Sequence, residues 1–214
     1  MCIRDRYHTL ILRKDGTVWA AGRNDYGQLG NGNTEKSTIF HQVKGENGIG
    51  YLQNIEQIVS EKYTSHALTA DGSIYSWGYN YYGQFGNKTT NGNASTYPEK
   101  MQKVSNIIQI TAGEHHISML DADGSIWSTG CNSNGQFGTG TTQSENVLPT
   151  QMLDTDGSVL YGVREIASGR DHTVLIKEDN TVWSVGYNGY GQLGLGTTSV
   201  SYTHLRAHET LSDL

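Results

Sequence analysis

Short runs of alternating apolar and polar residues, each ended by a tight turn, make up most of this chain. In the segment 8–22 (HTLILRKDGTVWAAG), two such runs are joined by Asp15 and Gly16. Alternation is the period of a half-buried β-strand, and an Asp-Gly pair readily supplies the positive φ angles of a tight hairpin. The segment therefore predicts a β-hairpin.

The same hairpin pattern occurs four times, with its turn position at Gly16, Gly72, Gly124 and Asn180. A further strand is predicted before the last three hairpins, at 55–60, 107–113 and 163–169. Another is predicted after the first three, at 37–43, 97–104 and 147–153. No convincing helical period occurs in this region. Four repeats of about four strands each predict an all-β fold of β-propeller blades.

A glycine-rich phrase, G-x-N-x-x-G-Q, follows each hairpin, and its second glycine recurs at intervals of 56, 52 and 56 residues. In the fourth copy it reads GYGQLG (189–194), which matches the GxGxxG of a dinucleotide-binding loop. That loop requires a long helix after it, and the residues downstream have no helical period. The other copies also lack the first glycine of the motif, so we reject a nucleotide site.

The order Ile-x-x-x-Gly-x-x-His, then Asp-Gly, then Trp-x-x-Gly-x-Asn-x-x-Gly-Gln-Leu-Gly resembles the regulator of chromosome condensation repeat over nearly all of residues 7–198. The resemblance implies a propeller that typically has seven blades, of which this chain would hold four. It also implies a non-catalytic domain that binds another protein. The alternative is guanine-nucleotide exchange on a small GTPase, but no insertion here matches the wedge loop which that activity uses.

Both ends of the chain depart from the repeat pattern. The segments 1–6 (MCIRDR) and 200–210 (VSYTHLRAHET) resemble translated sequencing-adapter DNA, read in opposite directions. We therefore expect residues 7–199 to be the native propeller fragment, and residues 1–6 and 200–214 to be adapter-derived and poorly packed. Such flanks, with loops rich in Asn, Gly and Thr, favour a bacterial protein from environmental DNA, at the cell surface or outside the cell.

Charge and motifs exclude several functions. The net charge is −6 and is unchanged when the two ends are left out, so there is no electrostatic basis for binding nucleic acid. No apolar run is long enough to insert in a membrane. No HExxH or GxSxG motif occurs. We therefore expect no enzyme activity and no cofactor, and a protein partner.

Comparing the four repeats separates a constant set of residues from a variable one. The constant set is expected to hold the blades and loops: Asn24, Asn80, Asn132 and Asn188 by capping backbone groups, and His8, His116 and His172 by anchoring a blade through ring hydrogen bonds. Thr64 stands at the histidine position of the second repeat. One histidine per blade argues against a metal site. The Trp19, Tyr75, Trp127 and Trp183 series predicts packing within or between blades.

The variable positions of the glycine phrase are the expected binding residues. Tyrosine is frequent there, and large rigid aromatic side chains are common at recognition surfaces. A tyrosine that simply covers a loop remains the alternative. The candidates for contact with a partner are Arg23, Asp25, Tyr26, Tyr79, Tyr81, Tyr82, Tyr187 and Tyr190.

Overall fold

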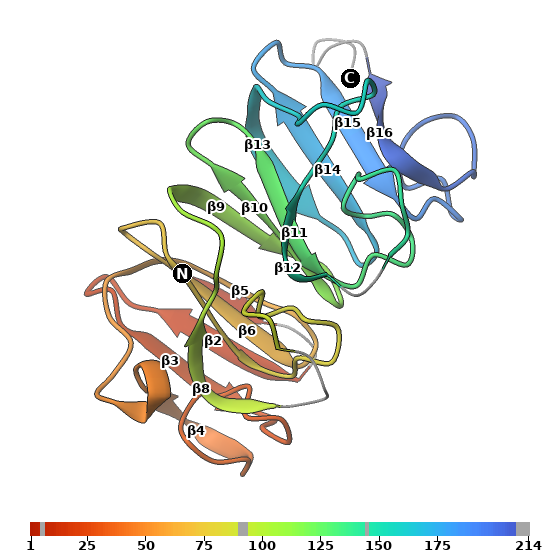
Figure 1. The fold of residues 1–214 in the computed structure, drawn as a ribbon. Helices are drawn as coiled ribbons and strands as arrows, with labels where there is room; N and C mark the ends of the chain where they lie inside the picture. The colour runs from red at the N-terminus through yellow and green to blue at the C-terminus, as the bar shows by residue number, and fades with distance from the viewer. Residues whose placement is uncertain (5–6, 90–93, 144–145, 209–214) are drawn as a thin grey trace.

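The computed structural model describes residues 1–4, 7–89, 94–143 and 146–208, and it forms four antiparallel sheets of four strands (Figure 1). The first sheet contains β1 (Cys2–Arg4), β2 (His8–Leu12), β3 (Val18–Gly22) and β4 (Ser37–Gln42). The second contains β5 (Ile55–Ser60), β6 (Thr64–Thr69), β7 (Ile74–Gly78) and β8 (Ser95–Lys100).

The third sheet contains β9 (Ile107–Ala112), β10 (His116–Asp121), β11 (Ile126–Gly130) and β12 (Asn146–Gln151). The fourth contains β13 (Val163–Ser168), β14 (His172–Lys177), β15 (Val182–Gly186) and β16 (Ser201–His208). Over the described residues the helical content is one short 3₁₀ turn, η1 (Glu46–Gly48). None of the described helical residues forms a segment long and apolar enough to cross a membrane.

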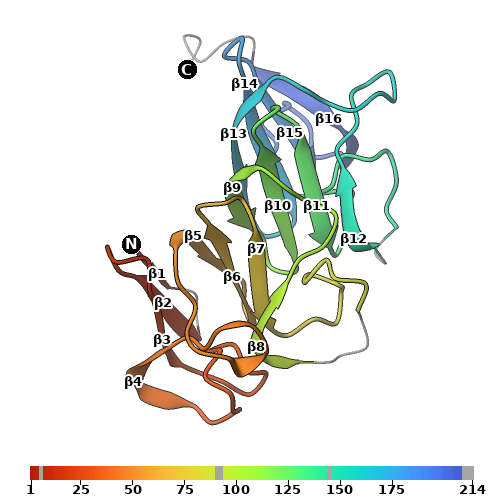
Figure 2. The same ribbon diagram turned by 60° about the vertical axis from the view of Figure 1, so that its left-hand side comes forward.

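The sheets follow one another in chain order as blades, here numbered 1 to 4. In Figure 2 the first strands β5, β9 and β13 lie one above another along one side of the molecule, and β8 and β12 lie along the other. Strand β5 contacts β2 and β9, and β9 contacts β13. The first strand of each blade is thus the innermost one, which is the arrangement of a β-propeller. The predicted all-β propeller fragment is confirmed.

The hairpin turns form as the sequence predicts. The backbone φ at Gly16, Gly72 and Gly124 is +75°, +77° and +78°, and Asn180 takes the same left-handed conformation at +67°. In blade 1 the Asp15 carboxylate accepts a hydrogen bond from the Thr17 amide at 3.1 Å. The Asp-Gly dipeptides of blades 1 to 3, and Asp179-Asn180 in blade 4, therefore set the reversal between the second and third strand.

The hydrophobic core consists of three layers, each between two successive blades. Between blades 1 and 2, Leu10 and Val18 pack with Ile55, Ile58 and Trp77, all buried. Comparable clusters of Ile, Leu and Met fill the spaces between blades 2 and 3 and between blades 3 and 4. No blade buries its apolar face alone, so the stability of each depends on its neighbours.

Glutamine side chains join the inner strands. The Gln57 amide of β5 donates to the Ile110 carbonyl at 2.8 Å, and its oxygen accepts from the Ile110 N–H at 2.9 Å. Gln109 of β9 makes the same pair of bonds with Ile166 of β13, both at 3.0 Å. These bonds satisfy inner-strand backbone groups that a purely apolar contact would leave without partners.

The two ends of the chain pair with the sheets, which differs from the expected poor packing. Cys2–Arg4 pair with β2 at the inner edge of blade 1, and Ser201–His208 pair with β15 at the outer edge of blade 4. Strand β1 takes the place of the first strand of blade 1, and β16 takes the place of the fourth strand of blade 4. The described side chains of Met1 and Cys2 are exposed. Residues 209–214 lie outside the described part.

Candidate functional site

The candidate binding residues lie just after the third strand of blades 1, 2 and 4. Gly22 pairs with His8, and Gly78 pairs with Thr64. The residue after each glycine therefore sits beside the residue before the second strand: the Arg23 N–H donates to the Tyr7 carbonyl at 2.9 Å, and the Tyr79 N–H to that of Tyr63 at 3.0 Å. Only glycine fits between them, because a Cβ on Gly78 would lie 2.3 Å from the Tyr63 carbonyl oxygen.

This geometry assembles a run of aromatic rings across blades 1 and 2, which we call the tyrosine face. Its ring centroids are spaced 5.5 Å for Tyr7 and Tyr63, 5.1 Å for Tyr63 and Tyr26, 4.8 Å for Tyr26 and Tyr79, 6.0 Å for Tyr79 and Tyr81, and 5.0 Å for Tyr81 and Tyr82. The run reaches blade 3 through the His115 ring, 4.9 Å from Tyr82. These are distances of favourable aromatic packing.

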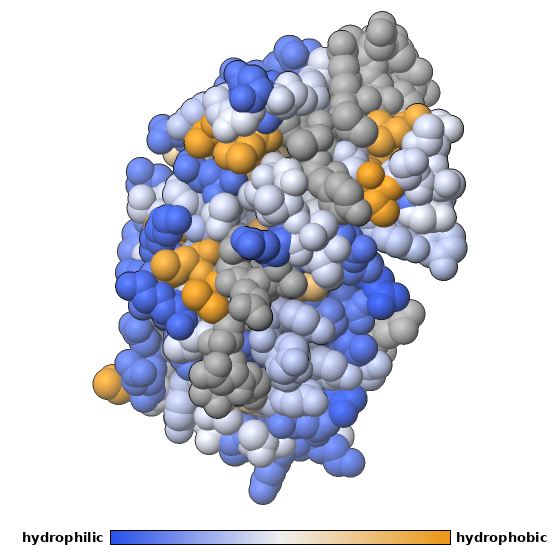
Figure 3. All heavy atoms as spheres, turned by 45° about the vertical axis from the view of Figure 1, so that its right-hand side comes forward, coloured by the Kyte–Doolittle hydropathy of each residue, from blue (hydrophilic) through white to orange (hydrophobic). Residues whose placement is uncertain are grey.

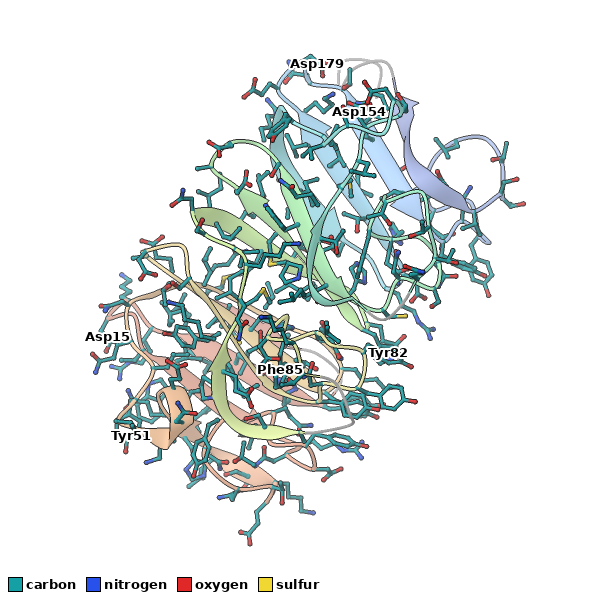
Figure 4. All side chains as sticks on the ribbon, viewed as in Figure 1. Asp15, Tyr51, Tyr82, Phe85, Asp154 and Asp179 are labelled. Atoms are coloured by element: carbon teal, nitrogen blue, oxygen red, sulfur yellow. The ribbon has the colours of Figure 1, made fainter. Side chains whose placement is uncertain are left out.

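The tyrosine face lies at the end of the blades opposite to the hairpin turns. In Figure 4, Tyr82 is on the side of the molecule away from Asp15 in the turn of blade 1. Elsewhere the surface shown in Figure 3 has its hydrophobic residues in small separate groups among hydrophilic ones. Tyr81 is 57% exposed, whereas Tyr26, Tyr79 and Tyr82 are half-buried. The face thus combines rings that are partly buried by their neighbours with an exposed ring that a partner can contact.

Charged side chains border the tyrosine face. The Arg23 guanidinium lies 5.3 Å from the centroids of both Tyr7 and Tyr63, and its Nε is 2.5 Å from Asp25. The hydrogen bond with Asp25 raises the pKa of Arg23. The Lys62 ammonium lies 5.3 Å from the Tyr63 ring. Such cation–π contacts fix the orientation of the rings and add polar groups to the face.

The hydroxyls of Tyr79 and Tyr82 are un-ionised at neutral pH. Burial raises the pKa of Tyr79 above its ordinary value, and neighbouring tyrosines such as Tyr26 raise it further. Burial also raises the pKa of Tyr82, with a smaller effect of Cys131. These two residues therefore present neutral hydroxyl groups, which can both donate and accept hydrogen bonds.

The structure groups six of the eight expected binding residues: Arg23, Asp25, Tyr26, Tyr79, Tyr81 and Tyr82. Tyr187 and Tyr190 contact each other on blade 4, at a centroid distance of 6.1 Å. Blade 3 separates them from the face, because it carries Cys131, Ser133 and Asn134 at the corresponding positions.

Sequence reasoning missed Tyr7, Tyr63 and His115. All three directly precede the histidine position of the repeat. In each hairpin, the residue before the histidine position lies beside the residue after the glycine that ends the third strand. Applying this pairing to the sequence would have identified all three.

The constant asparagines hold the loops behind the face. Asn80 is buried; its amide donates to the Thr89 carbonyl at 3.0 Å, and its oxygen accepts from the Phe85 N–H at 3.0 Å. Asn24, Asn132 and Asn188 make the corresponding bonds to Leu29, Phe137 and Leu193. The constant glutamines fix the variable positions themselves: the Oε1 of Gln28 and Gln84 accepts from the N–H of Tyr26 and Tyr82.

His8 and His116 contact the neighbouring blade, whereas the sequence predicted that each anchors its own blade. His8 Nε2 lies 2.8 Å from Ser65 Oγ of blade 2, and that hydroxyl donates to the Gln28 carbonyl. His116 Nε2 lies 3.5 Å from Thr173 Oγ1 of blade 4. Among the described residues no group of three or more His, Cys, Asp or Glu could hold a metal ion.

Comparison with known proteins identifies the repeat. A profile of the regulator of chromosome condensation (RCC1) repeat matches residues 71–120 and 123–176, and a second profile of the same repeat matches 6–28, 107–136 and 163–192. The chain belongs to the RCC1 repeat family. Each match to the first profile begins at the hairpin turn of one blade and ends in the second strand of the next, so a matched repeat spans parts of two successive blades. The Gly-Gln phrase lies in the loop that positions the tyrosine face.

Relatives of known name carry similar repeats within longer chains. The chain is 34% identical over 195 residues to the human probable E3 ubiquitin-protein ligase HERC4, covering 90% of this chain and 18% of that protein. It is 30% identical over 210 residues to the zebrafish (Danio rerio) protein RCC2 homolog, covering 87% of this chain and 41% of the relative. These relatives lend no support to the expected bacterial source.

Solved structures share the fold. Prp20p from Saccharomyces cerevisiae, described with its binding to Gsp1p and histones, superposes with a TM-score of 0.81 at 25% identity, over 98% of this chain and 50% of that one. Human WBSCR16 superposes with a TM-score of 0.82 at 21% identity, over 97% and 53%. The chain thus spans about half the length of the solved propellers it matches.

Proposed function

We propose that this chain is a non-catalytic protein-binding module, and that it contacts its partner through the tyrosine face. The observation that carries this proposal is the continuous run of rings from Tyr7 to Tyr82, which joins loops of two blades. Tyrosine buries a large area with few rotatable bonds, so a pre-packed cluster loses little entropy on binding.

The relatives support a binding role. Prp20 is described with bound Kap60 and with binding to Gsp1p and histones, all of which are proteins. The repeat scaffold in this chain places constant polar residues inside and variable aromatic ones at the surface. With this division, members of a family can keep one fold and still bind different partners through different surface residues.

The test is a substitution series on the face, read against a captured and identified partner. The complete chain serves as bait, and the dissociation constant of the purified pair is then measured by calorimetry. We expect Tyr79→Ala and Tyr81→Ala to weaken binding by about 1–3 kcal/mol, because hot-spot aromatic residues lose that much on truncation. Tyr81→Ala should leave the thermal midpoint unchanged, since that side chain is largely exposed.

Two controls make the series decisive. Tyr161 is 55% exposed, close to the 57% of Tyr81, but lies at the hairpin-turn end of blade 4, so Tyr161→Ala should leave affinity unchanged. Asn80→Ala should lower stability and spare affinity in the folded fraction. Equal losses of affinity for Tyr81→Ala and Tyr161→Ala would contradict the proposal, as would full affinity in both tyrosine-face variants.

Guanine-nucleotide exchange on a small GTPase is the second candidate, supported by the likeness to Prp20. It is tested by the release of a fluorescent guanine nucleotide from Gsp1p, the protein whose binding to Prp20p is described. Acceleration by this chain would favour exchange over simple binding. We expect no acceleration, because the sequence shows no insertion that matches a wedge loop.

A further inference from the structure

A cation lies over the aromatic residue of the third strand in three of the four blades. The distances from the cation to the ring centroid are 5.8 Å for Arg13 and Trp19, 5.6 Å for Lys103 and Trp127, and 5.3 Å for Lys177 and Trp183. These distances lie within the range of a favourable cation–π interaction. A cation on this ring is thus a recurring feature of the blades.

Blade 2 lacks this cation. Its aromatic residue is Tyr75, and among the described residues no cation lies over that ring. The position that holds Arg13 in blade 1 and Lys177 in blade 4 is Thr69 in blade 2. The Thr69 hydroxyl donates to the Asp71 carboxylate in the hairpin turn. One blade therefore carries the aromatic ring without a cation from the chain itself.

A cavity of about 420 Å³ lies beside Tyr75, and we call it the turn-end cavity. It is lined by residues of the segment 45–54, which leads from blade 1 to blade 2, and by residues 69–71 at the hairpin turn of blade 2. Two of the lining side chains, Ile49 and Tyr51, are 81% and 48% exposed. A ligand in the cavity can therefore contact aromatic and apolar groups that are accessible from solvent.

Two carboxylates border the turn-end cavity. Glu46 belongs to η1 and Asp71 to the hairpin turn, and both are exposed. Burial raises the pKa of Tyr75, and the charges of Glu46 and Asp71 raise it further. The hydrogen bond from Thr69 lowers the pKa of Asp71, with a smaller effect of Lys100. The lining itself contains no lysine or arginine, so its charged groups are negative.

The turn-end cavity lies at the opposite end of the blades from the tyrosine face. In Figure 4, Tyr51 is on the same side of the molecule as Asp15 and away from Tyr82. The Lys44 ammonium lies 4.7 Å from the Tyr51 ring centroid, but Lys44 lines a neighbouring cavity and not this one. A ligand bound here would therefore leave the tyrosine face free.

We propose that the turn-end cavity binds the guanidinium group of an arginine side chain from another protein. This group would take the place on Tyr75 that the chain's own cations take on the other three blades. A guanidinium is planar and has five N–H donors, so it can stack on the ring and also hydrogen-bond to Glu46 and Asp71. The volume lies in the range of small-ligand sites. This site goes beyond the proposed function, because it does not use the tyrosine face.

The experiment adds Nα-acetyl-arginine amide to the complete chain and follows the backbone amide shifts by NMR. We expect saturable shifts at Glu46, Asp71 and Tyr75. Nα-acetyl-citrulline amide has nearly the same shape but a neutral urea group in place of the guanidinium, and it should produce no saturable shifts. In Glu46→Gln the affinity for the arginine probe should fall about three- to fivefold, because an exposed carboxylate no longer pairs with the cation.

Two further variants test the position of the site. Thr69→Arg places in blade 2 the residue that blade 1 carries, so the chain's own guanidinium should cover Tyr75 and abolish the saturable shifts. Glu178→Gln removes an exposed carboxylate beside the hairpin turn of blade 4, outside the cavity, and should leave the affinity unchanged. Because Glu46 is also exposed, Glu46→Gln is expected to fold, and it serves if Thr69→Arg does not.

Three results would overturn the inference. They are equal shifts with the citrulline probe, equal affinities of Glu46→Gln and Glu178→Gln for the arginine probe, and unchanged affinity in a folded Thr69→Arg variant. Tyr81→Ala should bind the probe as the unmodified chain does, since Tyr81 lies on the tyrosine face. The probe needs no protein partner, so failure of the tyrosine series and failure of this site can be told apart.

Discussion

His116 shows how one side chain contributes to the contact between blades. Its ring is fully buried between blades 3 and 4, packed on Gly113 and facing Thr173 Oγ1. Burial, with smaller effects of His172 and His115, lowers the pKa of His116 to about 3. The ring therefore remains neutral in the folded chain at every pH at which the chain is expected to function.

This depressed pKa predicts a loss of stability in mild acid. Above about pH 6.5 the histidine is neutral in both the folded and the unfolded state, so its contribution is complete. Below that pH the histidine is protonated in the unfolded chain but stays neutral in the folded chain. This difference lowers the free energy of unfolding by about 2 kcal/mol at pH 5. Urea unfolding at pH 7.5 and pH 5 should show this difference.

The matched variant is His116→Gln, which does not titrate. It should be less stable than the unmodified chain at pH 7.5, but its loss between the two pH values should be smaller by about 2 kcal/mol. Parallel losses in the two proteins would show that His116 is not the group responsible. Burial also lowers the pKa of His172, and that contribution is common to both proteins.

At the scale of the element, blade 2 differs from its neighbours through linked substitutions. Where blades 3 and 4 carry glycine and histidine, blade 2 carries Glu61 and Thr64. The residue that the histidine contacts in the next blade changes as well. His8 contacts Ser65 of blade 2 and His116 contacts Thr173 of blade 4. The position of blade 3 that corresponds to Ser65 and Thr173 is Ile117, which has no hydroxyl group. We therefore expect these positions to be coupled by volume and by hydrogen bonding.

The coupling predicts a non-additive double-substitution cycle. Thr64→His alone should cost about 1–3 kcal/mol, because the new ring and the Glu61 side chain compete for one space. In the presence of Glu61→Gly the same change should cost less, with a coupling energy of about 1–2 kcal/mol. The free energies of unfolding of the four proteins, measured in urea, give this coupling. Additive values would contradict a shared space.

At the scale of the whole molecule, stability comes from the layers between blades. Each apolar cluster is shared by two sheets, and the amides of Gln57 and Gln109 join the inner strands of three blades. The edge strands contribute differently. At the inner edge of blade 1, β1 pairs with β2 through its backbone, and the described side chains there, those of Met1 just before the strand and of Cys2, are exposed. Neither of these two side chains belongs to the apolar layer between blades 1 and 2.

Deletion of residues 1–6 should therefore leave the thermal midpoint within about 2 °C of the complete chain, a smaller shift than a loss of 1 kcal/mol would cause at this size. A separate deletion of residues 200–214 tests the same expectation at blade 4, where β16 pairs with β15. Differential scanning fluorimetry of the three proteins measures both effects. A marked fall in either midpoint would show that the end belongs to the fold.

The sequence by itself determined the architecture. Period-two alternation and Asp-Gly turns are local signals, and each hairpin can be identified without knowledge of its neighbours. The fourfold repeat then predicted the blades, and Asn80 and its counterparts are buried and hydrogen-bonded to the loop backbone. These inferences succeeded because strand period and turn chemistry depend on residues close together in the chain.

Only the tertiary structure decided which side chains meet. Tyr7 and Tyr63 joined the candidate site because they pair within a blade with Arg23 and Tyr79, each 16 positions further along the chain. Contact between blades brings together residues more than 50 positions apart. The role of His8 between blades, and the meeting of segments 60–62, 112–114 and 168–170 around one cavity, have the same origin. The physical reason is that the angle and distance between packed sheets depend on all the side chains between them, which a pattern along one strand does not encode.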